Sequence, residues 1–146
     1  MREAANGGGF LSGRQLTASE QATLHAALAP VLHDIRAGQA IIPDIIDRSW
    51  DDDEGSVCAF LGTGGAPRAG VRVLLDPDPP GYPLAFLADQ VQDWEVEELA
   101  AAGRPATWPQ CPAHPDSHPL SAEAVEGAAV WRCPASGEVV ARIGEL

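Results

Sequence analysis

Apolar residues that recur every three or four positions indicate a first helix near the start of the chain. Five of them share one face: Leu24, Leu28, Val31, Leu32 and Ile35. Just before this face, Thr17 and Glu20 stand three residues apart and form the capping box that starts many helices. Gly38 is a suitable end, because glycine accepts the left-handed conformation that closes a helix. Pro30 lies inside and removes one backbone hydrogen bond, so we expect one bent helix or, alternatively, two short ones.

A β-hairpin is predicted next, because two β-rich runs of strand length follow one another at residues 57–61 and 71–75. The glycine-rich residues 62–68 between them predict a flexible loop. This loop lacks the Gly-Lys-Ser/Thr ending of phosphate-binding loops, which argues against a nucleotide site. Before the hairpin, the isoleucines at 41, 42, 45 and 46 are too apolar for water, so this connection is expected to lie against the core. The four consecutive acidic residues 51–54 favour a solvated loop over a cation site.

A second helix is predicted over residues 84–102, closed by Gly103 and kept from restarting by Pro105. Its apolar stripe consists of Leu87, Val91, Trp94 and Leu99. Its acidic residues predict an exposed face: Asp89, Asp93, Glu95, Glu97 and Glu98. The helix is therefore expected to pack on one side and to present negative charge on the other.

Two short Cys-Pro motifs mark the C-terminal segment 108–146. The first is Cys111-Pro112-Ala113-His114, and the second is Cys133-Pro134-Ala135-Ser136-Gly137. Both resemble the Cys-Pro-x-Cys-Gly knuckle of zinc-ribbon proteins, a tight turn whose sulfurs bind metal while backbone N–H groups point at them. The resemblance implies a small β-ribbon built around one zinc ion.

The match to the zinc-ribbon knuckle is incomplete, because serine, a poor zinc ligand, stands at position 136. A fourth ligand then has to come from elsewhere, and His118, four residues after His114, is the expected donor. The expected zinc ligands are therefore Cys111, His114, His118 and Cys133. Two Cys and two His in tetrahedral array form a normal structural zinc site. A ribbon of roughly 35–40 residues is also near the size at which small domains need a metal or a disulfide.

Residues 88–146 also resemble a family of small acidic proteins of GC-rich Gram-positive bacteria that has no assigned activity. The shared features are a Val-Gln-Asp-Trp-Glu-Val-Glu-Glu helix, Trp-Pro-x-Cys-Pro-x-His, His-Pro-Leu and Trp-x-Cys-Pro, which begin here at Val91, Trp108, His118 and Trp131. The resemblance implies that the tryptophans and the four ligands act as one unit. It implies no function.

Three alternatives to a structural zinc site remain open from the residues alone. The ribbon could pack on the preceding domain without metal, through Trp108 and Trp131 with neighbouring aliphatic side chains. It could hold a catalytic zinc with three ligands and a water, with Asp116 or Glu138 as base, if His118 swung away. A separate possibility is a Cys58 nucleophile with His25 or His33, although an apolar strand is an unusual place for a reactive thiol.

The charge balance narrows the choice of partner. The chain has 146 residues, of which 21 are acidic and nine are basic, all nine being arginine, for a net charge of −12. This charge repels nucleic acid backbones, so a protein with a basic surface is the expected partner. No run approaches the roughly 20 apolar residues that span a bilayer. The first residues lack the apolar core of a signal peptide, and three cysteines are an odd number, so we expect a cytoplasmic protein with reduced thiols.

These patterns predict an α+β fold with a bent N-terminal helix, a β-hairpin, an acidic second helix and a C-terminal zinc-ribbon-like β-ribbon. The expected organisation is a disordered tail at 1–14, a small α+β domain at 15–105 and a ribbon at 106–146 packed on it. The ribbon is expected to have two strands and could join the hairpin in one antiparallel sheet. For function, the patterns favour a non-enzymatic zinc-binding adaptor or regulatory protein. The alternative is a metal-dependent hydrolase with a three-ligand zinc.

Overall fold

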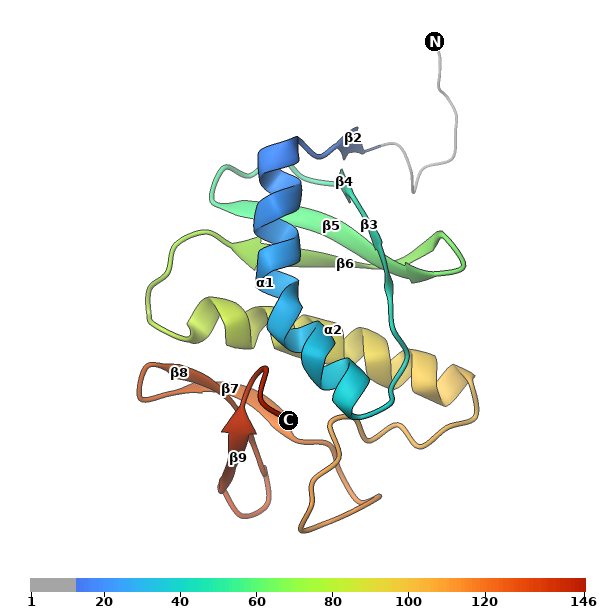
Figure 1. Cartoon of the computed structure of the whole chain (residues 1–146), viewed down its shortest axis with the longest axis vertical. Helices are drawn as coiled ribbons and strands as arrows, with labels where there is room; N and C mark the ends of the chain where they lie inside the picture. The colour runs from blue at the N-terminus through green and yellow to red at the C-terminus, as the bar shows by residue number, and fades with distance from the viewer. Residues whose placement is uncertain (1–12) are drawn as a thin grey trace.

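The computed structural model describes residues 13–146, and it has the predicted α+β fold. Two helices, α1 (Ala18–Ala37) and α2 (Tyr82–Ala101), cross one another (Figure 1). Within residues 13–146, eight strands form three antiparallel sheets, β2-β4, β3-β5-β6 and β7-β8-β9. The strands are β2 (Arg14–Gln15), β3 (Asp44–Ile46), β4 (Arg48–Ser49), β5 (Ser56–Thr63), β6 (Ala66–Leu74), β7 (Ser121–Val125), β8 (Ala128–Arg132) and β9 (Val139–Arg142). Residues 1–12 of the predicted tail lie outside the described part, whereas Arg14 already belongs to β2.

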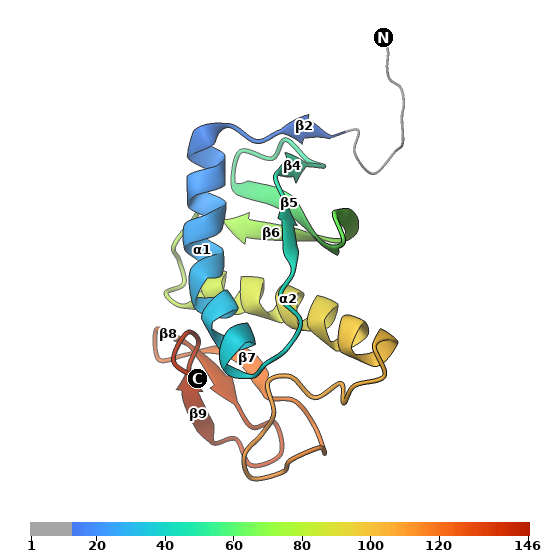
Figure 2. The ribbon, with the colours of Figure 1, turned by 45° about the vertical axis from the view of Figure 1, so that its right-hand side comes forward.

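The predicted start of α1 is confirmed. Thr17 Oγ1 accepts a hydrogen bond from the Glu20 N–H at 3.1 Å, and the Glu20 carboxylate accepts one from the Thr17 N–H at 2.9 Å. Gly38 is the C-cap. The helix continues through Pro30 as one element and changes direction in its second half (Figures 1 and 2), so the single bent helix is correct and two short helices are not.

The hairpin is longer than predicted, because β5 and β6 continue through most of the expected loop. Only Gly64 and Gly65 connect them, with φ of 61° and 79°. Both angles lie in the left-handed region that a two-residue hairpin turn needs and that glycine adopts without cost. The isoleucine-rich connection becomes a third strand, β3, where Ile45 packs against the core while Ile42, just before it, stays exposed.

Helix α2 lies between the β3-β5-β6 sheet and the C-terminal sheet (Figure 2). It therefore buries more than one stripe: Ala85, Leu87, Ala88, Val91, Gln92, Trp94, Glu95 and Leu99. On one side, the side-chain amide of Gln90 pairs with both the N–H and the C=O of Arg72 at 2.9 Å, as a neighbouring strand would. This pairing covers the free edge of β6. The expectation that hairpin and ribbon join in one sheet is wrong, since the helix separates them, and the ribbon has three strands.

Glu95 departs from the predicted exposed face of α2, because its side chain is completely buried. Asp89, Asp93 and Glu97 are exposed as expected, and they repeat every four residues along one row of the helix. The cause is tertiary, since the connection between α1 and β3 lies against this side of α2, where the Ile41 N–H donates to the Glu95 carboxylate.

The acidic loop 51–54 is organised by two arginines and holds no cluster of metal-binding geometry within the described residues. Arg72 contacts Asp51 at 2.7 Å and Asp53 at 3.5 Å, and Arg14 contacts Asp52 at 2.8 Å. The loop is thus tied to the sheet by ion pairs that are open to solvent.

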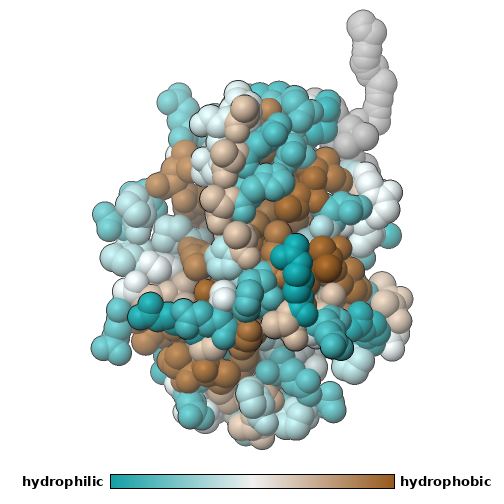
Figure 3. All heavy atoms as spheres, viewed as in Figure 1, coloured by the Kyte–Doolittle hydropathy of each residue, from teal (hydrophilic) through white to brown (hydrophobic). Residues whose placement is uncertain are grey.

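One cluster of buried apolar side chains extends from α1 and the β3-β5-β6 sheet into the ribbon, where it includes Trp108, Trp131 and Ile143. The buried apolar side chains of the ribbon thus belong to the same cluster as those of α1. Over the face shown in Figure 3, hydrophilic atoms predominate, and hydrophobic atoms reach the surface beside β3 and over β9. Within residues 13–146, neither helix has the length and apolar character needed to cross a membrane.

Candidate metal centre

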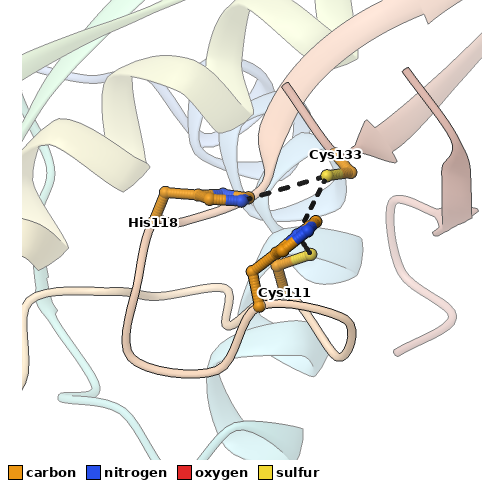
Figure 4. A group of neighbouring side chains, drawn as sticks. Cys111, His118 and Cys133 are labelled. Carbon is orange, nitrogen blue, oxygen red and sulfur yellow. Dashed lines mark hydrogen bonds between the residues drawn. The ribbon is translucent and has the colours of Figure 1, made fainter. Parts of the chain in front are cut away.

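Two segments bring the four expected ligands to one place. Cys111, His114 and His118 lie on the loop between α2 and β7, and Cys133 lies directly after β8. The neck of the loop is closed by a hydrogen bond from the Leu120 N–H to the Pro109 carbonyl at 2.8 Å. The loop is therefore closed at its base. The side chains of Cys111 and His118 point toward Cys133, in the turn after β8 (Figure 4).

Three of the distances between the donor atoms are close to those of a metal-binding tetrahedron. The Sγ of Cys111 lies 3.5 Å from His114 Nδ1, and the Sγ of Cys133 lies 3.6 Å from His114 Nδ1 and 3.9 Å from His118 Nε2. All four donor atoms lie within 4.8 Å of one another. Zinc–sulfur bonds of about 2.3 Å and zinc–nitrogen bonds of about 2.0–2.1 Å place a tetrahedral S and N about 3.6 Å apart. The residues present thus fit a four-coordinate metal ion.

The tautomer of His118 is also suited to a metal. Its Nδ1 lies 3.1 Å from the carbonyl oxygen of Pro119. A carbonyl only accepts, so Nδ1 carries the proton and Nε2, which faces Cys133, is left with a free lone pair. Metal-binding histidines commonly have this second hydrogen bond, which orients the ring and selects the nitrogen that binds.

Cys133 sits in a true knuckle turn even though serine replaces its fourth ligand. The Gly137 N–H donates to the Cys133 carbonyl at 2.8 Å, and Gly137 takes the left-handed φ of 80° that the turn needs. Ser136 donates its backbone N–H to Cys133 Sγ at 3.4 Å. Hydrogen bonds from the Ser136 side chain and then from its backbone lower the pKa of the Cys133 thiol to about 6. Serine here stabilises the thiolate, a role that the sequence argument did not assign to it.

Two buried polar side chains that sequence reasoning missed hold the loop between α2 and β7 against the helices. Gln92 of α2 donates its side-chain amide to the carbonyls of Trp108 and Leu120, on either side of the ligand loop. Asp34 of α1 accepts a hydrogen bond from the Trp108 indole N–H through its backbone carbonyl. Its carboxylate accepts one from the Trp131 indole N–H. The sequence offered one signal for both residues, because each is a polar residue on the apolar face of a predicted helix.

The alternative nucleophile is not assembled. Cys58 lies in β5, where its thiol contacts the Ser56 hydroxyl at 3.8 Å and burial raises the pKa of the thiol. His25 contacts Asp47 at 3.3 Å and His33 contacts Asp34 at 2.9 Å. The chain therefore does not pair this thiol with a histidine.

The two acids considered as bases differ in position. Asp116 accepts a hydrogen bond from the Gln110 side chain at 3.4 Å. Glu138 lines a cavity of about 220 Å³ that also borders Cys111 and Cys133. Of the two, Glu138 is the one that shares a cavity with ligand residues.

No family model, no curated protein and no solved structure matches this chain. The likeness to zinc ribbons and to the acidic bacterial family thus rests on the motifs, and the metal centre rests on its geometry.

Proposed function

We propose that this protein is a non-enzymatic zinc-binding adaptor or regulatory protein, in which the metal stabilises the C-terminal ribbon and an acidic surface binds a basic partner. The observation that carries the zinc part is the set of distances among the four donor atoms, which lie within 4.8 Å of one another. Two thiolates and two imidazoles suit zinc better than the hard cations, which prefer oxygen. Thiolate ligands also require reducing conditions, so the proposal includes a cytoplasmic location.

A structural role is favoured because four protein ligands leave no coordination position for water. A catalytic zinc keeps one position open. The hydrogen bond from His118 Nδ1 to the Pro119 carbonyl supports a bound His118, since it directs Nε2 toward Cys133. A metal held in this way crosslinks the loop 109–120 to the turn after β8.

Metal content tests the zinc part directly. Native mass spectrometry of the freshly purified, reduced protein should give one zinc per chain. Cys133→Ala should lose it and unfold at lower temperature, whereas the matched control Cys58→Ala removes a buried thiol from β5 and should keep the metal. A metal-free wild-type protein, or a Cys133→Ala variant that retains zinc, would contradict the proposal.

The acidic part of the proposal centres on the row Asp89, Asp93 and Glu97 of α2, which is exposed. Partial burial, followed by the charge of Asp93, raises the pKa of the Asp89 carboxyl. Negative charge on Asp89 is therefore costly in the free protein, and a cationic partner would offset this cost. Charge of this kind acts mainly on association, and salt screens it.

A polyarginine peptide serves as a probe of this surface. Neutralising Asp89, Asp93 and Glu97 to their amides should weaken binding several-fold more than neutralising Asp76, Asp78 and Glu126, which are also exposed. Both triple variants change the net charge equally. Equal weakening by the two triples, or binding that does not fall as salt rises, would remove the acidic row from the proposal.

The alternative, a metal-dependent hydrolase with a three-ligand zinc, is supported by one observation. The cavity beside Cys111 and Cys133 is lined by Glu138, a carboxylate that could serve as base. This function requires His118 to leave the metal. X-ray absorption of the zinc-loaded protein separates the two functions, because a shell of two sulfurs and two nitrogens supports the structural role and an oxygen in place of one nitrogen supports the hydrolase.

A further inference from the structure

We infer that Asp34, in the last turn of α1, is the positioning residue of the metal centre: it holds together the two chain segments that supply the four ligands. This inference rests on the proposed zinc binding. Asp34 is far from the ligands in sequence, and its side chain is completely buried.

Both ligand segments are anchored to Asp34 through a tryptophan. Trp131, two residues before Cys133, donates its indole N–H to Asp34 Oδ2 at 2.7 Å. Trp108, three residues before Cys111, donates its indole N–H to the Asp34 backbone carbonyl at 3.2 Å. The two indole rings meet edge to face with centroids 5.4 Å apart. One helical residue therefore sets how far apart the two segments lie just before their first ligands.

The same carboxylate also binds the end of the chain. The Gly144 N–H donates to Oδ2 at 2.6 Å, and the Leu146 N–H donates to Oδ1 at 3.0 Å. Gly144 fits closely, because an added Cβ would lie 2.8 Å from Pro30. The segment after β9 is thus held against α1. The turn that carries Cys133 lies at the opposite end of β9, so β9 connects this turn to the anchored segment.

Both oxygens of Asp34 are used as acceptors, which explains why a carboxylate is needed. Oδ2 accepts from Trp131 and Gly144, and Oδ1 accepts from Leu146 and contacts His33 Nδ1 at 2.9 Å. Asparagine has the same shape as aspartate. Its NH₂ group would take the place of one carboxylate oxygen and would face N–H donors from which it cannot accept. Asp34→Asn therefore removes one of the two acceptor oxygens while it conserves volume.

A displaced ligand weakens metal binding, because metal–ligand bonds tolerate only small changes in length. A zinc site accepts deviations of only about 0.2 Å in its ligand distances. A shift of either tryptophan moves Cys111 or Cys133 away from the imidazoles. Residues that orient metal ligands from outside the coordination sphere typically contribute 10–100-fold in metal affinity.

The test is a zinc titration of the full chain under reducing conditions, in competition with a chromogenic chelator. Asp34→Asn should bind zinc roughly 10–100-fold more weakly than wild type. The matched control is Glu95→Gln, which alters another buried carboxyl that contacts Ile41 and no ribbon residue, and it should stay within about twofold of wild type. Cobalt(II) adds a spectroscopic readout, since a displaced thiolate changes the intensity of the visible bands of a tetrahedral site.

Asp34→Asn with wild-type zinc affinity and a wild-type cobalt spectrum would overturn the inference, even if the variant were less stable. Should that variant fail to fold, Trp131→Phe removes only the indole donor and keeps most of the ring. It should weaken zinc binding by several-fold, and wild-type affinity in a folded Trp131→Phe would equally overturn the inference. A wild-type chain that binds no zinc would instead overturn the proposed function on which the inference rests.

Discussion

Glu95 should make the stability of this protein depend on pH in an unusual direction. The side chain is buried in α2, and its Oε1 accepts a hydrogen bond from the Ile41 N–H at 2.6 Å. Within residues 13–146 its other oxygen has no hydrogen-bond partner. Burial raises the pKa of this carboxyl from 4.5 to about 7, although the bond from Ile41 and the charge of Arg104 act in the opposite direction.

A raised carboxyl pKa means that the folded protein binds the proton more tightly than the unfolded chain does. The stabilising contribution of the protonated group is complete below pH 4.5 and is lost as the pH rises to about 7. At about 1.4 kcal/mol per pKa unit, the full difference is on the order of 3 kcal/mol. About 2.5 kcal/mol of it should disappear between pH 5 and pH 8.

Glu95→Gln should remove this dependence, because the amide keeps an acceptor for Ile41 and does not ionise. Urea unfolding of both proteins at pH 5 and pH 8 measures the effect, with zinc at the same saturation. The variant should gain about 2.5 kcal/mol relative to wild type between the two pH values. Glu97→Gln, exposed on the same helix, is the matched control. A difference between Glu95→Gln and wild type that does not change with pH would refute the reasoning.

Three further predictions concern the metal and the packing around it. Removing zinc with a chelator should lower the unfolding free energy by about 2.7 kcal/mol relative to protein held at 100 times the dissociation constant, measured by urea unfolding. Gln92→Ala should cost about 1–3 kcal/mol in the same assay, because it leaves the buried carbonyls of Trp108 and Leu120 without their donor. Gly70→Ala should change tryptophan fluorescence, since the new Cβ would lie 2.7 Å from the partly exposed Trp50 ring, which then has to move. An unchanged stability in the first two cases, or an unchanged fluorescence in the third, would contradict the contact concerned.

The local features of the fold were predictable because short-range patterns encode them. The Thr17–Glu20 capping box, the end of α1 at Gly38 and the extent of α2 depend on residues a few positions apart. The four Cys and His residues of the candidate metal centre were also predictable as a group, since their knuckle spacing is typical of metal ligands. In each case the chemistry of a few neighbouring residues was sufficient.

The tertiary structure decided which polar groups lie inside. Asp34 and Gln92 look like ordinary polar interruptions of helical stripes until the ribbon closes over them. Glu95 stood on a face that the sequence placed in water, and the connection between α1 and β3, which contacts it through Ile41, covers that face. Burial depends on which elements come together over distances of more than 50 residues, and no local period records that.

By itself, the sequence determined the two helices, the presence of the hairpin and the four Cys and His residues of the candidate metal centre. Only the tertiary structure decided that hairpin and ribbon form separate sheets, that Ser136 supports a thiolate instead of binding metal, and that Asp34 joins both ligand segments. The physical reason is the separation along the chain between the residues that interact. Helix caps and turns are governed by hydrogen bonds between near neighbours. The position of the ribbon depends on burying two tryptophans against a helix that begins some 90 residues earlier in the chain.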